Sequence, residues 1–168
     1  MHMLKSALLV VSALGASASV PAQNSLPSCG SAEYRAFDFW IGEWDVHGAN
    51  GKLAGTNSIK REIAGCILHE RYQTGRGYSG ESFNIYDASR KVWHQTWVDS
   101  TGLLLLLEGG LRDGKMVLEG QTTGANGKIT KQRISWTPNP DGSVRQLWES
   151  TGPTGDRQVV FDGMYTRK

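Results

Sequence analysis

Tryptophan and glutamine alternate in two segments of the chain. Gln95 lies between Trp93 and Trp97, and Gln146 lies two residues before Trp148. Side chains two positions apart on a β-strand share one face, so each amide would lie beside an indole ring. Indole rings stack on apolar molecules, and amides orient such molecules through a few hydrogen bonds. This spacing predicts a small-molecule pocket, with ordinary packing between strands as the alternative.

Two further pairs of residues share a face under the same rule. Glu70 and Tyr72 lie two positions apart, as do Asn84 and Tyr86. Each pair joins an aromatic ring to a side chain that forms hydrogen bonds. The predicted ligand-binding residues are therefore Glu70, Tyr72, Asn84, Tyr86, Gln95, Trp97, Gln146 and Trp148. Their chemistry suits a small apolar or amphipathic ligand.

Proton transfer is the catalytic chemistry that His94 or Glu70 could perform. An imidazole titrates near neutrality, and a carboxyl group in a cavity can acquire a perturbed pKa. If Trp93 and Trp97 face inward, His94 faces solvent, whereas in the opposite register His94 and Val98 face the cavity. We expect the first arrangement. An enzyme for acid–base isomerisation or hydrolysis, using His94 or Glu70, is thus the alternative to a binding protein.

Other catalytic motifs are missing from the sequence or lack their structural context. The run from Gly75 to Gly80 matches Gly-x-Gly-x-x-Gly, yet no helical pattern follows it to hold a pyrophosphate. We expect a flexible hairpin there, or a loop at the mouth of a barrel. His69 and Glu70 are adjacent, so on a strand they face opposite sides and cannot share a metal ion. The sequence predicts no metal site and no cofactor.

The first 22 residues have the three-part pattern of a signal peptide. Lys5 supplies a positive charge, residues 6–18 are small or apolar, and residues 19–22 offer a cleavage site. The apolar run is shorter than the roughly 20 residues of a membrane-spanning helix, so an uncleaved anchor is the less favoured alternative. An exported protein, periplasmic or extracellular, is therefore expected. In that setting two cysteines favour one disulfide, between Cys29 and Cys66, over two free thiols.

The charges of the chain are nearly balanced. The formal net charge is +2, and 20% of the residues are charged. The longest basic cluster, Lys60-Arg61, is too short for the basic surface that nucleic acids require. The only strongly apolar helix candidate is the leader itself. We therefore expect neither nucleic-acid binding nor membrane insertion after removal of the signal peptide.

Short strand-like segments, separated by glycine-containing turns, follow residue 37 with almost no helical periodicity. The ten predicted strands span residues 41–47, 53–63, 66–73, 81–87, 91–98, 103–109, 115–121, 129–137, 143–150 and 158–167. An open sheet of ten hairpin-joined strands would expose its edges, and closure into an antiparallel up-and-down barrel removes them. We predict an all-β barrel domain at 37–168 behind a lead-in at 23–36. A two-sheet sandwich is the alternative, although its crossings need longer loops.

The segment FDFWIGEWDV, which begins at Phe37, is expected to close one end of this barrel. Gly42 and Trp44 within it are similar to the Gly-x-Trp signature of lipocalins and the wider calycin group. The longer WIGEW resembles the opening of nitrobindin-type ten-stranded barrels. Together with residues 80–87 and 93–99, the segment resembles an uncharacterised bacterial family of exported lipocalin-like proteins, named only for a domain of unknown function. The resemblance implies a barrel with a central pocket and carries no established activity.

The resemblance to nitrobindin-type barrels also raises haem, which those barrels can hold through a histidine near the C-terminus. This chain has no histidine after His94. The predicted last strand carries Tyr165, and tyrosine can ligate haem iron, although a tyrosine at that position is more often a packing residue. We therefore do not expect haem.

Five consecutive leucines, residues 103–107, make both faces of one predicted strand apolar. The outer face of such a strand needs a cover, either the N-terminal segment or a second subunit. The sequence thus predicts a homodimer. It also leaves open a third function, that of a structural protein whose barrel is filled by side chains and whose leucine strand binds a partner.

Overall fold

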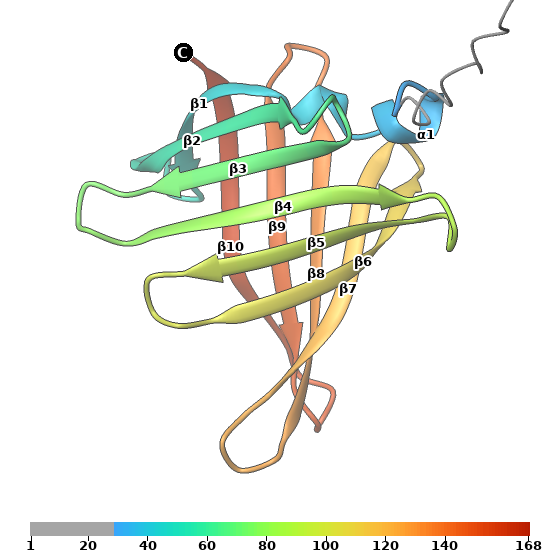
Figure 1. Ribbon diagram of the computed structural model, residues 1–168. Coiled ribbons are helices and arrows are strands. Elements are labelled where there is room, and N and C mark those ends of the chain that lie inside the picture. Colours follow the sequence, from blue (N-terminus) through green and yellow to red (C-terminus); the bar gives the residue numbers. More distant parts are fainter. Residues whose placement is uncertain (1–28) are drawn as a thin grey trace, which may run out of the picture.

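The computed structural model describes residues 29–168, so the predicted signal peptide at 1–22 and the start of the lead-in lie outside the described residues. Two short helical turns precede ten strands (Figure 1). The helical turns are α1 (Ala32–Arg35) and η1 (Asp38–Trp40). The strands are β1 (Gly42–Gly48), β2 (Leu53–Glu62), β3 (Ile67–Gln73), β4 (Ser79–Asp87), β5 (Val92–Asp99), β6 (Leu104–Arg112), β7 (Lys115–Thr123), β8 (Ile129–Pro138), β9 (Val144–Thr151) and β10 (Arg157–Arg167). No helix in residues 29–168 is long and apolar enough to cross a membrane.

Every strand pairs antiparallel with its neighbours in sequence, and β1 also pairs with β10. The sheet therefore closes on itself, which confirms the predicted ten-stranded up-and-down barrel. The two-sheet sandwich is wrong because it requires crossings between sheets, and all the observed pairings join consecutive strands or the β1–β10 seam. The closed barrel is consistent with the calycin or lipocalin type of fold.

Large aromatic side chains close one end of the barrel. Phe37 and Trp40 are fully buried, and their rings stack with centroids 4.9 Å apart. Trp93 and Trp136 pack edge-on against Phe37 at 5.6 and 5.1 Å. Trp44 lies below them and donates its indole N–H to the carbonyl of Trp40 at 3.0 Å. The segment that begins at Phe37 therefore plugs the barrel, with Phe37 and Trp40 just before β1 and Trp44 within it.

The seam between β1 and β10 explains the Gly-x-Trp spacing. Trp44 is directly opposite Arg167 in the register, and the guanidinium lies over the indole ring at 4.5 Å from its centroid. Arg167 also donates to the carbonyl of Ile41 at 3.3 Å. A Cβ atom at Gly42 would lie only 2.7 Å from an Arg167 nitrogen, so a side chain there would displace the arginine. Gly42 thus permits a cation–π contact that holds the two ends of the sheet together.

One disulfide joins the N-terminal segment to the barrel. Cys29 and Cys66 are bonded, as predicted, and Cys66 lies in the turn between β2 and β3. Arg35 donates to the carbonyl of Cys29 at 2.6 Å, and Trp93 donates to the carbonyl of Glu33 at 3.1 Å. These contacts fix α1 beside the closed end, where Figure 1 shows it in blue.

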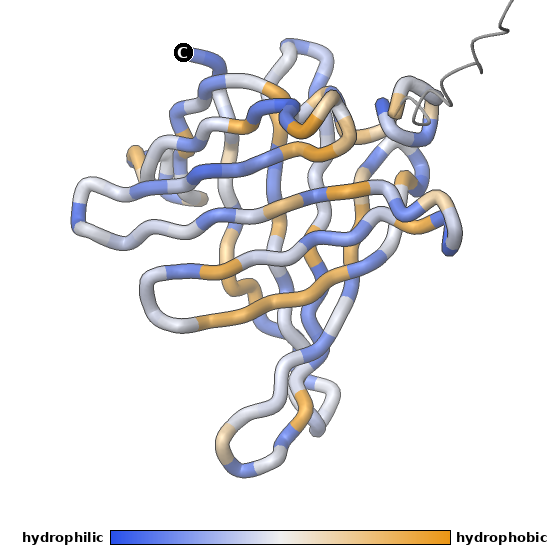
Figure 2. Tube along the Cα trace, in the orientation of Figure 1, coloured by the Kyte–Doolittle hydropathy of each residue, from blue (hydrophilic) through white to orange (hydrophobic). Residues whose placement is uncertain are grey.

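Strands β4, β5 and β6 contain apolar stretches, orange in Figure 2, and several of their apolar side chains are exposed on the outer surface. Leu105 and Leu107 are buried inside the barrel, whereas Leu104 and Leu106 are 56% and 49% exposed. The exposed large apolar residues of these three strands are Phe83, Ile85, Val98, Leu104, Leu106 and Leu111. The apolar outer face matches the expectation from the leucine run, and the homodimer stays a prediction.

Candidate functional site

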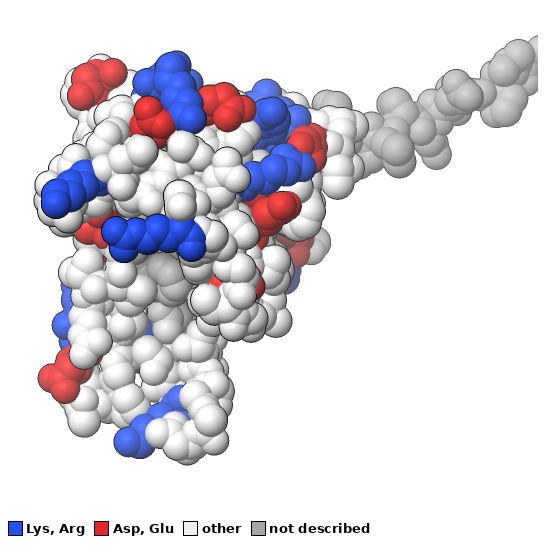
Figure 3. All heavy atoms as spheres, turned by 90° about the vertical axis from the view of Figure 1, so that its left-hand side faces the viewer, with Lys and Arg blue, Asp and Glu red and all other residues white. Residues whose placement is uncertain are grey.

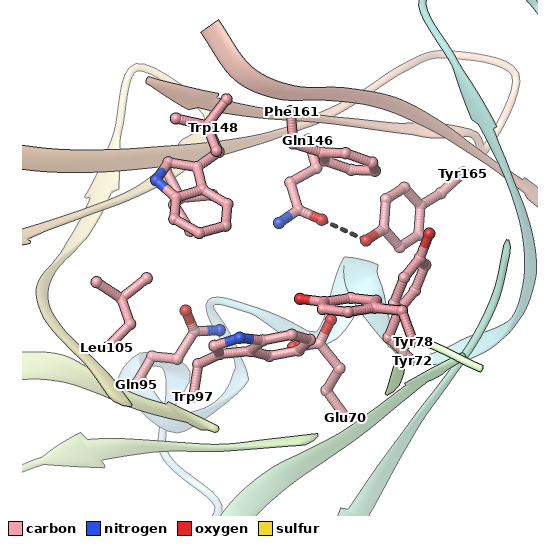
Figure 4. A pocket seen from close by; sticks show the side chains of 12 residues that line it. Glu70, Tyr72, Tyr78, Gln95, Trp97, Leu105, Gln146, Trp148, Phe161 and Tyr165 are labelled. Atoms are coloured by element: carbon pink, nitrogen blue, oxygen red, sulfur yellow. Dashed lines mark hydrogen bonds between the residues drawn. The ribbon is translucent and has the colours of Figure 1, made fainter. Parts of the chain in front are cut away.

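The barrel contains a cavity of about 280 Å³ on the open side of the aromatic plug. Its lining residues come from six strands and the β3–β4 loop, and ten of the twelve are labelled in Figure 4. They are Glu70, Tyr72, Tyr78, Gln95, Trp97, Leu105, Ile134, Gln146, Trp148, Val160, Phe161 and Tyr165. Figure 3, which views the side of the barrel where the β3–β4 and β5–β6 loops lie, shows the charged side chains gathered mainly above a largely uncharged area. Most of the lining residues are aromatic or aliphatic, so the cavity is apolar with a few polar groups.

Three strand glycines leave space for the aromatic walls of the cavity. A Cβ atom at Gly80 would overlap the indole ring of Trp97. A Cβ atom at Gly55 would lie 2.7 Å from the Tyr72 hydroxyl oxygen, and one at Gly163 would lie 2.5 Å from the ring of Phe161. Since these positions carry no side chain, the rings lie flat against the sheet, and this arrangement leaves the centre of the barrel open.

Glu70 is the acidic group of the cavity and is only 3% exposed. Its two carboxyl oxygens accept hydrogen bonds from Asn57 at 2.7 Å and from Ser82 at 2.6 Å. Burial raises the pKa of Glu70 to about 7, against the opposing effects of these two hydrogen bonds and of the nearby charge of His69. The carboxyl group can therefore gain or lose a proton near neutral pH.

Tyr165 and Gln146 form the polar contact opposite Glu70. The Tyr165 hydroxyl donates to the carbonyl oxygen of Gln146 (dashed in Figure 4) and accepts a bond from Asn57 at 3.2 Å. Burial raises the pKa of Tyr165 well above its usual value, and the charge of Glu70 adds to the rise. The hydroxyl therefore stays protonated. The amide nitrogen of Gln146 points toward the centre of the cavity in Figure 4.

A chain of side-chain amides fixes the orientation of Gln95. Asn84 donates from its amide nitrogen to the carbonyl of Leu68 at 3.2 Å, which leaves its amide oxygen to accept from Gln95 at 2.9 Å. The amide nitrogen of Gln95 therefore points away from the cavity, toward Asn84, and its carbonyl oxygen points into the cavity. The cavity gains an oriented hydrogen-bond acceptor from this arrangement.

Tyr78 and Trp97 lie at the mouth of the cavity and share one partner. The Tyr78 hydroxyl donates to Asp99 at 3.0 Å, and the indole N–H of Trp97 donates to the same carboxylate oxygen at 3.4 Å. Burial and the hydrogen bond to Asp99 both raise the pKa of Tyr78. The loop between β3 and β4 is thus joined to the end of β5 across the opening.

The structure brings six of the eight predicted ligand-binding residues together around the cavity: Glu70, Tyr72, Gln95, Trp97, Gln146 and Trp148. Asn84 lies behind the wall and holds Gln95 in place. Tyr86 lies at the closed end, where its ring meets those of Tyr34 at 5.3 Å and Trp93 at 6.3 Å. Neither Asn84 nor Tyr86 lines the cavity.

His94 faces outward, in the register that we favour from the alternation around it. Its ring nitrogens lie 3.2 Å from Glu108 and 2.9 Å from Thr96, on the outer face of the sheet. The two inward neighbours, Trp93 and Gln95, are both buried. His94 therefore cannot reach a molecule bound in the cavity, and Glu70 is the one catalytic candidate that lines it.

Sequence reasoning did not assign six lining residues to the cavity: Tyr78, Leu105, Ile134, Val160, Phe161 and Tyr165. Phe161 follows an irregularity in the pairing of β9 with β10, so simple alternation along β10 does not show which of its residues face inward. From Phe161 onward, Gly163 and Tyr165 follow at intervals of two, and this pattern was the available signal. Tyr78 lies in a loop just before β4, where strand periodicity gives no direction.

The lining residues do not suit haem iron. Within residues 29–168 no histidine lines the cavity, and the Tyr165 hydroxyl is held by Asn57 and Gln146. The same part of the chain contains no group of three or more His, Cys, Asp or Glu side chains arranged to hold a metal ion.

The fold and the cavity together define a ten-stranded, lipocalin-like β-barrel with an internal pocket. No known protein-family model matches the chain, and no curated protein matches its sequence.

Proposed function

We propose that this protein binds a small apolar or amphipathic molecule inside its barrel. The observation that carries the proposal is the cavity of about 280 Å³, which lies inside the sheet and presents both aromatic rings and oriented polar groups. Pockets of this composition hold apolar ligands by ring stacking and select them by a few hydrogen bonds. A barrel filled by its own side chains, the structural alternative, would have no such space.

Export and family membership belong to the same proposal. The leader-like residues 1–22 and the Cys29–Cys66 disulfide support an exported, oxidised protein. The barrel and the plug segment support membership of the uncharacterised exported lipocalin-like family that the sequence resembles. We propose that the mature protein begins at residue 23 and acts in the periplasm or outside the cell.

Native mass spectrometry of protein recovered from the periplasm tests both export and ligand binding. We expect a chain that starts at residue 23 and carries a co-purified small molecule. Trp97→Ala and Trp148→Ala each remove a ring from the cavity wall, and each should weaken retention of that molecule about tenfold or more.

Phe83→Ala is the matched control for the two tryptophan variants. It removes an aromatic ring from the outer face of the barrel, where Phe83 is 49% exposed. The control should retain the molecule like the wild-type protein. Equal retention by all three variants would contradict the proposed site.

A second candidate function rests on Glu70. Its carboxyl group lies in the cavity with a pKa raised to about 7, which suits a general acid or base at neutral pH. An acid–base enzyme, for isomerisation or hydrolysis, would lose turnover in Glu70→Gln while it retained its substrate. If the protein only binds its ligand, the wild-type protein shows no turnover and Glu70→Gln changes only the binding.

A further inference from the structure

The carboxyl group of Glu70 has no cationic partner in the described part of the chain. Its oxygens accept from Asn57 and Ser82, and both of these donors are neutral. The ionisable groups nearest to it across the cavity are tyrosines, namely Tyr72, Tyr78 and Tyr165. A buried carboxylate without an ion-pair partner is unfavourable, and a cation brought by a ligand would relieve this.

The nearest basic side chain faces away from the cavity. His69 precedes Glu70 on β3, so it points to the outer face of the barrel. There its two ring nitrogens contact Glu62 at 3.1 Å and Glu81 at 2.7 Å, and its ring packs against Phe83. His69 is therefore engaged outside the wall and does not form an ion pair with Glu70.

Two side-chain amides of the cavity present one acceptor and one donor to a ligand. The carbonyl oxygen of Gln95 points into the cavity, because its amide nitrogen donates a hydrogen bond to Asn84. Only Gln146 presents an amide nitrogen to the centre, as Figure 4 shows. A ligand whose polar end donates hydrogen bonds is thus matched by two oriented acceptors, from Glu70 and Gln95.

Aromatic rings surround the same region. Tyr72, Trp97 and Trp148 line the same cavity as Glu70. The faces of such rings carry negative electrostatic potential and attract organic cations, Trp most strongly. The apolar part of a ligand would stack on the same rings.

From these contacts we propose that the ligand is a small organic amine. Its protonated nitrogen lies against Glu70 and Gln95, and its apolar, ring-containing body stacks between Trp97 and Trp148. This inference rests on the proposed function and narrows it, since it disfavours fatty acids and other anionic ligands, which Glu70 would repel.

Three probes with one ring system and different polar ends test the inference. They are naphthylmethylamine, naphthylmethanol and naphthoic acid, whose binding to the full mature protein is measured by calorimetry at about pH 8, above the pKa of Glu70. We expect the amine to bind about 10- to 100-fold more tightly than the alcohol, and the acid to bind most weakly.

The variant Glu70→Gln separates the charge from the shape of the site. It should lose the preference for the amine while it binds the alcohol like the wild-type protein, and this unchanged binding also shows that the variant is folded. Glu43→Gln removes an exposed carboxylate from β1 and should keep the preference. In wild-type protein at about pH 5.5 the preference should shrink, because Glu70 is then protonated and the amine stays charged.

The outcomes distinguish the two proposals. If the alcohol binds as tightly as the amine, the amine inference is wrong and the proposed pocket stands. If no probe binds, both proposals are wrong. A preference that persists in Glu70→Gln would also overturn the inference, because the carboxylate would then not be its source.

Discussion

Glu70 occupies a position where neutral donors replace the water that a carboxylate normally has. Two hydrogen bonds offset part of the lost hydration, and the pKa of about 7 shows that burial outweighs them. The folded protein therefore holds a proton on Glu70 at pH values where the unfolded chain has released it. The pKa of Glu70 is thus set by a balance between desolvation, which raises it, and hydrogen bonding, which lowers it.

This balance predicts how stability depends on pH. The pKa of Glu70 rises from an ordinary 4.5 to about 7 on folding, so between these values the folded state binds more protons than the unfolded state. The free energy of unfolding should therefore fall as the pH rises through this window, by about 3 kcal/mol in total, and level off above it. Urea unfolding of the wild-type protein and Glu70→Gln between about pH 5 and pH 8 measures the contribution.

The difference between the two proteins isolates Glu70, because every other titrating group is common to both. Glu70→Gln should gain stability relative to the wild-type protein as the pH rises. Parallel curves for the two proteins would mean that the carboxyl group keeps an ordinary pKa in the fold.

The alternation of the sequence predicted which residues face inward and did not predict how deep they lie. Asn84 and Tyr86 share the inner face of β4 with Ser82, yet Tyr86 belongs to the closed end of the barrel. Depth depends on the tilt and stagger of neighbouring strands, which a single strand does not encode. Asn84 also shows that an inward amide can be fully engaged by the wall itself.

Among the strands, the pairing of glycine with an aromatic ring determines the shape of the cavity. Gly80 lies on β4 two positions from Ser82, the register partner of Trp97, so the indole ring crosses diagonally over the glycine. Such pairs shield the exposed backbone at glycine and hold the ring in one orientation. The glycines in these strands are thus as important to the pocket as the rings are.

Gly80→Ala should displace the ring of Trp97, because the added methyl group would overlap it. We expect a loss of about 1–3 kcal/mol in the free energy of unfolding, together with a change in tryptophan fluorescence and weaker ligand retention. Gly110→Ala is the matched control, since Gly110 lies in β6 with open space where its Cβ would be. Equal effects of the two substitutions would contradict a specific role for the glycine–tryptophan pair.

The elements themselves were the most predictable part of the molecule. Glycine-containing turns separate the predicted strands, and their bounds agree with the observed ones to within three residues. The largest difference is at the end of β6, which continues through two glycines to Arg112. The predicted strand stops at 109, and because glycine weakens the interior of a strand the sequence alone does not show that it continues past Gly110. Closure of the barrel followed from the number and order of the hairpins.

For the whole molecule, the Cys29–Cys66 disulfide limits the freedom of the unfolded chain. The bridge spans 37 residues, which include the plug, β1 and β2. Replacing both cysteines by serine should lower the free energy of unfolding by about 3–4 kcal/mol, measured by urea denaturation at constant pH.

The barrel itself should survive this replacement, because the plug is held by Trp93 and Trp136 independently of the disulfide. Circular dichroism of the double serine variant should therefore match that of the wild-type protein. A variant within about 1 kcal/mol of the wild type would mean that the reduced, unfolded chain is already compact in this region.

The seam between β1 and β10 also makes closure of the barrel depend on the last residues of the chain. Arg167 and its acceptor Ile41 are 126 residues apart, so β1 gains its second partner only when almost the whole chain is available. Until then the sheet has one free edge at β1 and another at the last strand that has formed. A message that ends a few codons early would leave both edges open for the lifetime of the protein.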